Sequence, residues 1–231
     1  KDAARAETLF EVLLEREPYS ASLRTGLALA ELAQGDLDRA RIELDEAIAL
    51  DPRAATPRLL LGVVLDRVDD HAGAQEQYEQ AHALRPNDWV ILNNLGVSHL
   101  LAGEPEAAET SLRRSVRLQP RDPALRNNLG LALGLQGLHD EALKQFRQVA
   151  SEPEARNNLG WVLYLSGDYA AAIDQFELAL DVEGEAVLTV LRNIELASEA
   201  LGRAPEIGFE ALPVETAETT DGSDPTPEDP S

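Results

Sequence analysis

The stretch that decides the fold is residues 89–122, WVILNNLGVSHLLAGEPEAAETSLRRSVRLQPRD, because its features recur along the chain at a fixed interval. Its Leu95-Gly96 step is one of four Leu-Gly steps that recur in the same phase. The other three are Leu61-Gly62, Leu129-Gly130 and Leu159-Gly160, and successive glycines are 34, 34 and 30 residues apart. A period of this length indicates a stack of similar supersecondary units, each completing the core of its neighbours.

Further residues keep the same phase as these glycines. Stepping back 34 residues from Gly62 gives Leu27-Ala28, so the first unit carries alanine in place of glycine. Alanines follow twelve residues after each small residue, at Ala40, Ala74, Ala108, Ala142 and Ala172. Large apolar residues follow four later, at Leu44, Tyr78, Leu112, Phe146 and Phe176. Prolines at Pro18, Pro52, Pro86 and Pro120 end the units. Such spacing predicts pairs of helices that touch through small residues, and prolines that stop the second helix.

These anchors resemble the tetratricopeptide repeat family, whose 34-residue helix–turn–helix unit has Leu-Gly, then Ala, then an aromatic residue, then Pro. The resemblance implies an all-α fold, a right-handed α-solenoid of such repeats with a C-terminal capping helix. We interpret residues 1–20 as the second helix of a truncated repeat and expect at least one helix before Lys1 in the natural protein. The remaining segments are five repeats at 21–54, 55–88, 89–122, 123–152 and 153–186, a capping helix at 187–202 and an acidic tail at 203–231.

Two departures from the repeat pattern have structural consequences. The fourth unit is four residues short, and the deletion falls between His139 and about Ser151, so we expect a changed pitch between the fourth and fifth units. Arginine also replaces the family's aromatic residue at the fourth position of four units. We expect these arginines to lay their stems over the neighbouring helix with their heads in water. They are Arg24, Arg58, Arg126 and Arg156.

Composition narrows the possible partners. The net charge of −22 argues against nucleic-acid phosphates and against docking on an anionic membrane surface. No cysteine is present, and no apolar run approaches the roughly 18 residues needed to span a bilayer. Residues 204–231 carry eight acids and no base, and we predict that this tail is disordered. Within it, residues 207–214 are apolar enough for a short docking segment, although a plain linker is the simpler interpretation.

Three consecutive units carry a pair of asparagines in the first helix. In the family, positions 2, 5, 6, 9, 12 and 13 of a repeat point mainly into a concave groove, and the doublets occupy positions 5 and 6. The six residues are Asn93, Asn94, Asn127, Asn128, Asn157 and Asn158. An amide offers both a donor and an acceptor, so such a file resembles an asparagine ladder that holds an extended chain by its backbone. The alternative is that these are ordinary solvated helix residues.

Apolar residues occupy position 9 of every unit, including Val97, Leu131 and Trp161, and Tyr164 follows three residues after the tryptophan. A contiguous apolar stripe on a concave surface indicates an interaction site, and Trp and Tyr are favoured anchors. Packing between adjacent first helices is the alternative. With the six asparagines, these four residues form our candidate partner-binding set. Position 2 carries no lysine, which argues against a clamp for a C-terminal carboxylate.

Nothing in the chain indicates chemistry. The four histidines, which we expect at the surface, lack metal-ligand spacing, and no phosphate-binding loop or nucleophile motif occurs, so we predict no enzyme, no metal and no cofactor. We interpret the chain as a scaffold that binds an extended or helical segment of another protein. The alternatives are a self-associating solenoid, hence a homo-oligomer, or a lipoprotein-like accessory subunit of pilus or secretion machinery. The arginine-rich composition suggests a bacterial source, with the cytoplasm and the periplasm both open.

Overall fold

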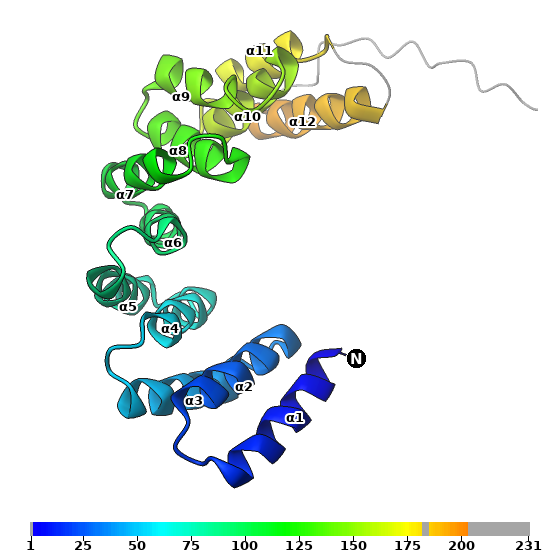
Figure 1. Ribbon diagram of the computed structural model, residues 1–231. Helices are drawn as coiled ribbons and strands as arrows, with labels where there is room; N and C mark the ends of the chain where they lie inside the picture. The colour runs from blue at the N-terminus through cyan, green and yellow to red at the C-terminus, as the bar shows by residue number, and fades with distance from the viewer. Residues whose placement is uncertain (1, 182–184, 203–231) are drawn as a thin grey trace, which may run out of the picture.

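The computed structural model describes residues 2–181 and 185–202, and these residues form helices and turns without a strand (Figure 1). The acidic tail and its segment 207–214 lie outside the described residues. The helices are α1 (Asp2–Arg16), α2 (Ala21–Gln34), α3 (Leu37–Leu50), α4 (Ala55–Arg67), α5 (His71–Leu84), α6 (Trp89–Leu101), α7 (Pro105–Leu118), α8 (Pro123–Leu135), α9 (His139–Phe146), α10 (Glu152–Leu165), α11 (Tyr169–Leu178) and α12 (Glu185–Leu201).

The helices stack into an arc. Each helix packs against its neighbours in sequence, and α4, α6, α8 and α10 also contact one another. In Figure 1, α3, α5, α7 and α9 follow the outer side of the arc, whereas α4, α6, α8 and α10 follow its inner side. This arrangement confirms the predicted all-α solenoid of helix–turn–helix repeats, and α12 covers its C-terminal end.

The first helix of each repeat is followed by a residue in the left-handed conformation. Gly35, Gly103, Gly137 and Gly167 have φ between 75° and 84°. Asp69 occupies the equivalent place after α4 with φ 61°, and among the described residues it is the one non-glycine with positive φ. A left-handed residue turns the chain sharply enough for the second helix to pack back on the first. The next helix is commonly capped by an Asp side chain, such as Asp36 or Asp168.

The two helices of a repeat touch at the repeated glycine. A Cβ atom added to Gly130 would lie 2.3 Å from the Phe146 ring, and one added to Gly160 would lie 2.5 Å from Phe176. The aromatic ring therefore occupies the space that a side chain at the glycine position would need. Both rings are almost fully buried, which contributes about 2–3 kcal/mol each by area. Buried residues form two clusters, one from α2 to α6 and one from α7 to α12.

The short fourth repeat loses length from its second helix. Helix α9 has 8 residues and ends at Phe146, whereas α7 in the preceding repeat has 14 residues. The chain then passes through residues 147–151 into α10, where Ser151 and Glu154 form a capping box. This segment brings Val149 and Ala150 close to the inner side of the arc, where other repeats have the end of a longer helix.

The expectation for the position-four arginines is wrong in one respect, because their heads bond to protein rather than only to water. Arg126 donates from Nη1 to Gln145 at 2.8 Å and from Nε to the Pro120 carbonyl at 2.7 Å. Each of the other three makes the same bond to the residue 19 positions later. These pairs are Arg24–Glu43, Arg58–Gln77 and Arg156–Gln175, at 2.7, 3.5 and 2.9 Å. The arginines thus tie the first helix of a repeat to its second helix.

The four histidines are half-buried rather than exposed, which also corrects the expectation. His71 Nδ1 lies 3.0 Å from Asp66, and the same carboxylate accepts from Ser98 of the next repeat at 2.7 Å. Burial and the nearby Arg114 guanidinium lower the pKa of His82. In the described ranges, no three His, Cys, Asp or Glu side chains gather as metal ligands, and no helix is long and apolar enough to cross a membrane.

Candidate partner-binding groove

The ten candidate residues lie on three successive inner helices, α6, α8 and α10. All ten are half-buried, because each inner helix leans on the next one. The inner side of the arc therefore presents amide groups and apolar side chains together, rather than a row of fully exposed groups. The contacts of each asparagine show which amides are already engaged within the chain.

Amides of α6 are largely used internally. Asn128 on α8 donates to Oδ1 of Asn93 on α6 at 2.9 Å, so this pair links the third and fourth repeats. Asn94 donates to the carbonyl of Val90, one turn back in its own helix, at 2.8 Å. Neither arrangement uses all donors and acceptors of an amide. The remaining groups are still oriented by these bonds, which lowers the entropy lost when a ligand binds.

A second amide pair joins the fifth repeat to α12. Asn157 and Asn193 bond to each other at 2.7 Å. The Asn193 atom in this bond also lies 3.2 Å from Nε1 of Trp161. If the Asn193 amide turns so that its oxygen accepts from the indole N–H, the Asn157 amide must turn as well and donate to that oxygen through its Nδ2. Asn193 is 5% exposed, so its amide is satisfied by protein neighbours rather than by solvent.

Between these two pairs the ladder is interrupted. Asn93 and Asn128 are 35 residues apart, but the equivalent Asn127 and Asn158 are only 31 apart, because the fourth repeat lacks four residues. No hydrogen bond joins them. Oδ1 of Asn127 is buried and has no hydrogen-bond partner in the described part of the chain. A buried acceptor without a donor costs about 1–3 kcal/mol, and because this oxygen is closed to solvent, the Asn127 side chain has to rotate before an outside donor can reach it.

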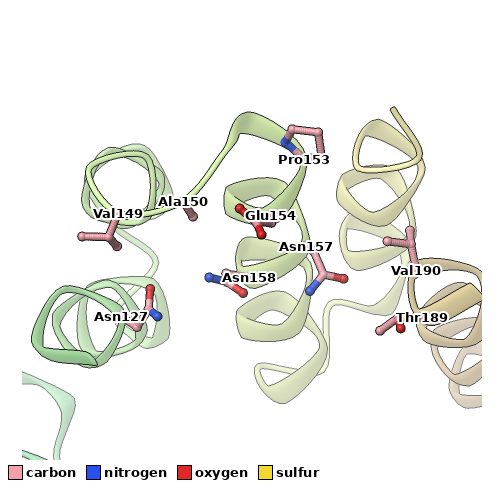
Figure 2. Close-up of a pocket in the computed structure, with 9 residues that line it drawn as sticks. All are labelled: Asn127, Val149, Ala150, Pro153, Glu154, Asn157, Asn158, Thr189 and Val190. Atoms are coloured by element: carbon pink, nitrogen blue, oxygen red, sulfur yellow. The ribbon is translucent and has the colours of Figure 1, made fainter. Parts of the chain in front are cut away.

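A pocket of about 380 Å³ opens where the ladder is interrupted (Figure 2). Figure 2 shows Asn127 of α8 on one side, Asn158 and Glu154 of α10 in the centre, and residues of α12 on the other side. The full lining is Asn127, Val149, Ala150, Pro153, Glu154, Asn157, Asn158, Thr189 and Val190. Three of the six candidate asparagines therefore meet in one cavity.

Glu154 is the one charged residue among the pocket's lining residues. Its carboxylate accepts from the backbone N–H and hydroxyl of Ser151, both at 2.8 Å. These hydrogen bonds lower the pKa of Glu154 below its usual value, so the carboxylate is ionised at neutral pH. The pocket thus combines a negative charge and an unpartnered acceptor with apolar walls from Val149 and Val190.

The apolar candidates are held partly by the core. The Trp161 ring lies edge-on to Tyr164 and Phe176, with centroids 5.3 and 5.9 Å apart. Leu131 packs against the same buried cluster, whereas Val97 lies further along the arc on α6. Each of the four residues is only partly buried. Leu131, Trp161 and Tyr164 therefore pack against the core and still expose part of their surface.

Asn193, Val149, Ala150 and α12 residues such as Thr189 were missing from the sequence-based candidate set. Asn193 lies 36 residues after Asn157, close to the repeat period, and this spacing could have revealed it. Val149 and Ala150 could not be recognised from a motif. They line the pocket only because the deletion brings a turn to a place where other repeats have a helix.

An inner surface of this kind, on a stack of two-helix units, defines the class of helical-repeat scaffolds. Tetratricopeptide-repeat family models match residues 1–62 and, in overlapping pieces, residues 59–123, 98–152 and 146–185. The chain belongs to the tetratricopeptide repeat family. This family and the solved structures of similar fold support a role as a scaffold for protein–protein interaction.

Several solved structures share the fold. YrrB, described as a tetratricopeptide-repeat protein with an unusual peptide-binding site, is 24% identical, with a TM-score of 0.66 over 84% of this chain and 97% of YrrB. MamA is 23% identical, with a TM-score of 0.59 over 64% of this chain and 86% of MamA. The Cut9–Hcn1 complex of the APC/C gives 21% identity and a TM-score of 0.63, over 87% of this chain and 42% of the matched chain.

Among curated proteins, the BBSome complex member bbs-4 of Caenorhabditis elegans is 24% identical over 113 residues. The match covers 49% of this chain and 24% of bbs-4, so the chain spans about a quarter of that relative's length. At such identities the likenesses establish the shared fold, and the groove of this chain must be judged from its own residues.

Proposed function

We propose that this chain binds an extended or helical segment of another protein along the inner side of its arc. Asparagines of α6, α8 and α10 would pair with the segment's backbone, and Val97, Leu131, Trp161 and Tyr164 would hold its apolar side chains. The observation that carries the proposal is the register of the asparagine doublets, which lie at the same inner position on three successive helices. YrrB, of similar fold, is described as having a peptide-binding site, which supports the same use here.

Backbone pairing and apolar anchoring suit each other in this groove. An amide pairs with the N–H and C=O that every peptide unit carries, so it holds a segment with little dependence on sequence. Half-buried apolar side chains add selectivity, because only certain side chains fill the spaces between them. The scarcity of basic residues along the groove argues against recognition of a terminal carboxylate.

Selection from a phage-displayed library of random peptides tests the proposal, because the library itself supplies candidate segments of every composition. An enriched peptide is then titrated calorimetrically against the wild-type chain and against Asn94→Ala combined with Leu131→Ser. We expect about tenfold weaker binding or more, since a backbone hydrogen bond and an apolar contact are lost together. Asn87→Ala, in the exposed turn before α6, is the control and should bind like wild type.

Failure to enrich any peptide, or equal affinity of the double variant, would count against the proposal. Leu131 packs against the core, so a thermal melt accompanies each titration. Only variants that melt as cooperatively as the wild type are compared. Light scattering of the free chain separates binding of a partner from self-association, which would show as a mass that rises with concentration.

A further inference from the structure

The interrupted ladder has chemical properties that the rest of the groove lacks. Elsewhere the inner amides bond to one another or to their own helix, as in the Asn93–Asn128 and Asn157–Asn193 pairs. At the interruption, Oδ1 of Asn127 is buried without a donor, and the Asn158 side chain makes no hydrogen bond within the described ranges. The cavity between them is therefore the place in the ladder where, among the residues that the structure describes, two neighbouring amides make no side-chain hydrogen bond to each other or to their own helices.

Charge selects the type of group that would fill this cavity. Glu154 supplies a carboxylate, and none of the nine lining residues is basic. Arg126 and Arg156, the arginines closest in sequence to Asn127 and Asn158, are held by Gln145 and Gln175. An occupant with several N–H donors and a positive charge would pair with the carboxylate and, once the Asn127 side chain rotates, with its Oδ1 as well.

Shape and polarity narrow the occupant further. Val149, Ala150 and Val190 give the pocket apolar walls that suit the methylene stem of a long side chain. A guanidinium offers five donors in a planar fork and is more weakly hydrated than an ammonium group, so it enters a half-buried pocket at lower cost. Resting on the proposed binding of a protein segment, we propose that this pocket accepts an arginine side chain of the partner.

The chain's own tail is a poor occupant. Residues 204–231 carry eight acids and no base, so they offer no group that complements Glu154. The net charge of −22 also disfavours a second copy of the chain, whereas it attracts a basic segment of a different protein. Charge complementarity thus points to a separate, basic partner segment bound near the junction of the fourth and fifth repeats.

Peptide selection followed by a double-mutant cycle tests the assignment. We expect peptides enriched on the wild-type chain to share an arginine, and we expect citrulline, its neutral isostere, to weaken binding about tenfold at that position. Glu154→Gln should remove most of this discrimination between arginine and citrulline. Glutamine preserves the capping box with Ser151, so the variant is expected to keep its fold.

Matched variants separate the pocket from general electrostatics. Asn127→Asp adds a charge beside the guanidinium and should strengthen arginine binding, whereas Asn127→Leu should abolish the preference. Glu106→Gln is the control, because Glu106 is an exposed acid in the first turn of α7, outside the pocket. It removes the same net charge and should leave the preference for arginine intact.

The outcomes distinguish the two proposals. Peptides that bind the groove and respond to Asn94→Ala with Leu131→Ser, yet show no arginine preference, would overturn the arginine pocket and leave the scaffold function standing. The same holds if Glu154→Gln keeps the full discrimination, or if light scattering shows a dimer that Glu154→Gln dissolves. No enrichment of any peptide would overturn both proposals.

Discussion

Single residues in this solenoid show where the repeat pattern and the chemistry of a position disagree. Glu31 occupies a position on α2 where other repeats carry the buried leucines Leu65, Leu133 and Leu163. It is 1% exposed, and its Oε1 lies 3.0 Å from the Arg39 guanidinium of α3. Burial raises the pKa of Glu31 to about 7, although the nearby arginine acts in the opposite direction.

We predict that Glu31→Gln stabilises the protein above neutral pH and has little effect in mild acid. A carboxyl group whose pKa is higher in the folded state favours folding at low pH, and this contribution is lost as pH rises from about 4.5 through 7. Ionised Glu31 therefore costs about 3–4 kcal/mol above pH 8, at about 1.4 kcal/mol per pKa unit. Thermal melts at pH 8 and pH 5 measure the difference between wild type and variant.

The control for Glu31 is Glu11→Gln. Glu11 contacts the same Arg39, at 3.2 Å, but its side chain is half exposed. An exposed ion pair contributes at most about 1 kcal/mol, so this variant should melt close to the wild type at both pH values. If the benefit of Glu31→Gln were equally large at pH 5, its cause would be packing rather than ionisation.

Within four repeats, an arginine at position four of the first helix bonds to the second helix. Position four and the residue 19 places later vary together: arginine stands with Glu or Gln in four repeats, and Leu92 stands with Ser111 in the third. This internal covariation was visible in the sequence. Its meaning required the structure, which shows the guanidinium bonding to the second helix and, in three repeats, to a proline carbonyl.

We predict that Arg126→Lys destabilises the protein by about 1–2 kcal/mol, although the charge is kept. The lysine ammonium is a compact charge at the end of its side chain and cannot bond to both Gln145 and the Pro120 carbonyl. The planar guanidinium of Arg126 bonds to both. Urea and thermal unfolding measure the loss. Arg121→Lys, at an exposed position in the turn before α8, is the control, and an equal loss there would contradict the proposed role of the contact.

For the whole molecule, the sequence predicted the fold much better than the details of the groove. Small residues at a fixed period define which helices meet, so Gly130 and Phe146 alone specify a contact. The hydrogen bonds between amides in the groove depend on how successive repeats are aligned. The four-residue deletion changes this alignment, and the sequence does not indicate which amide loses its partner. The sequence located the asparagines, but only the structure distinguishes the engaged Asn93 from the unpartnered Asn127.

The deletion can be reversed by copying residues 115–118 of the third repeat into the chain after Gln148. This insertion restores the 34-residue length, so Asn127 and Asn158 become 35 residues apart, like Asn93 and Asn128. We predict that α9 lengthens towards the 14 residues of α7 and that Asn158 donates to Asn127, which closes the pocket. Satisfying the buried acceptor should add about 1–3 kcal/mol of stability.

Two measurements check the insertion, a crystal structure of the variant and its preference for arginine over citrulline peptides. The preference should fall to about one, since the unpartnered acceptor that selects the guanidinium is then occupied. Binding through α6 should persist, because Asn94 and Val97 lie three helices before α9, the helix that the insertion lengthens. Retained arginine preference in a chain whose amide ladder is continuous would show that the deletion does not create the specificity of this groove.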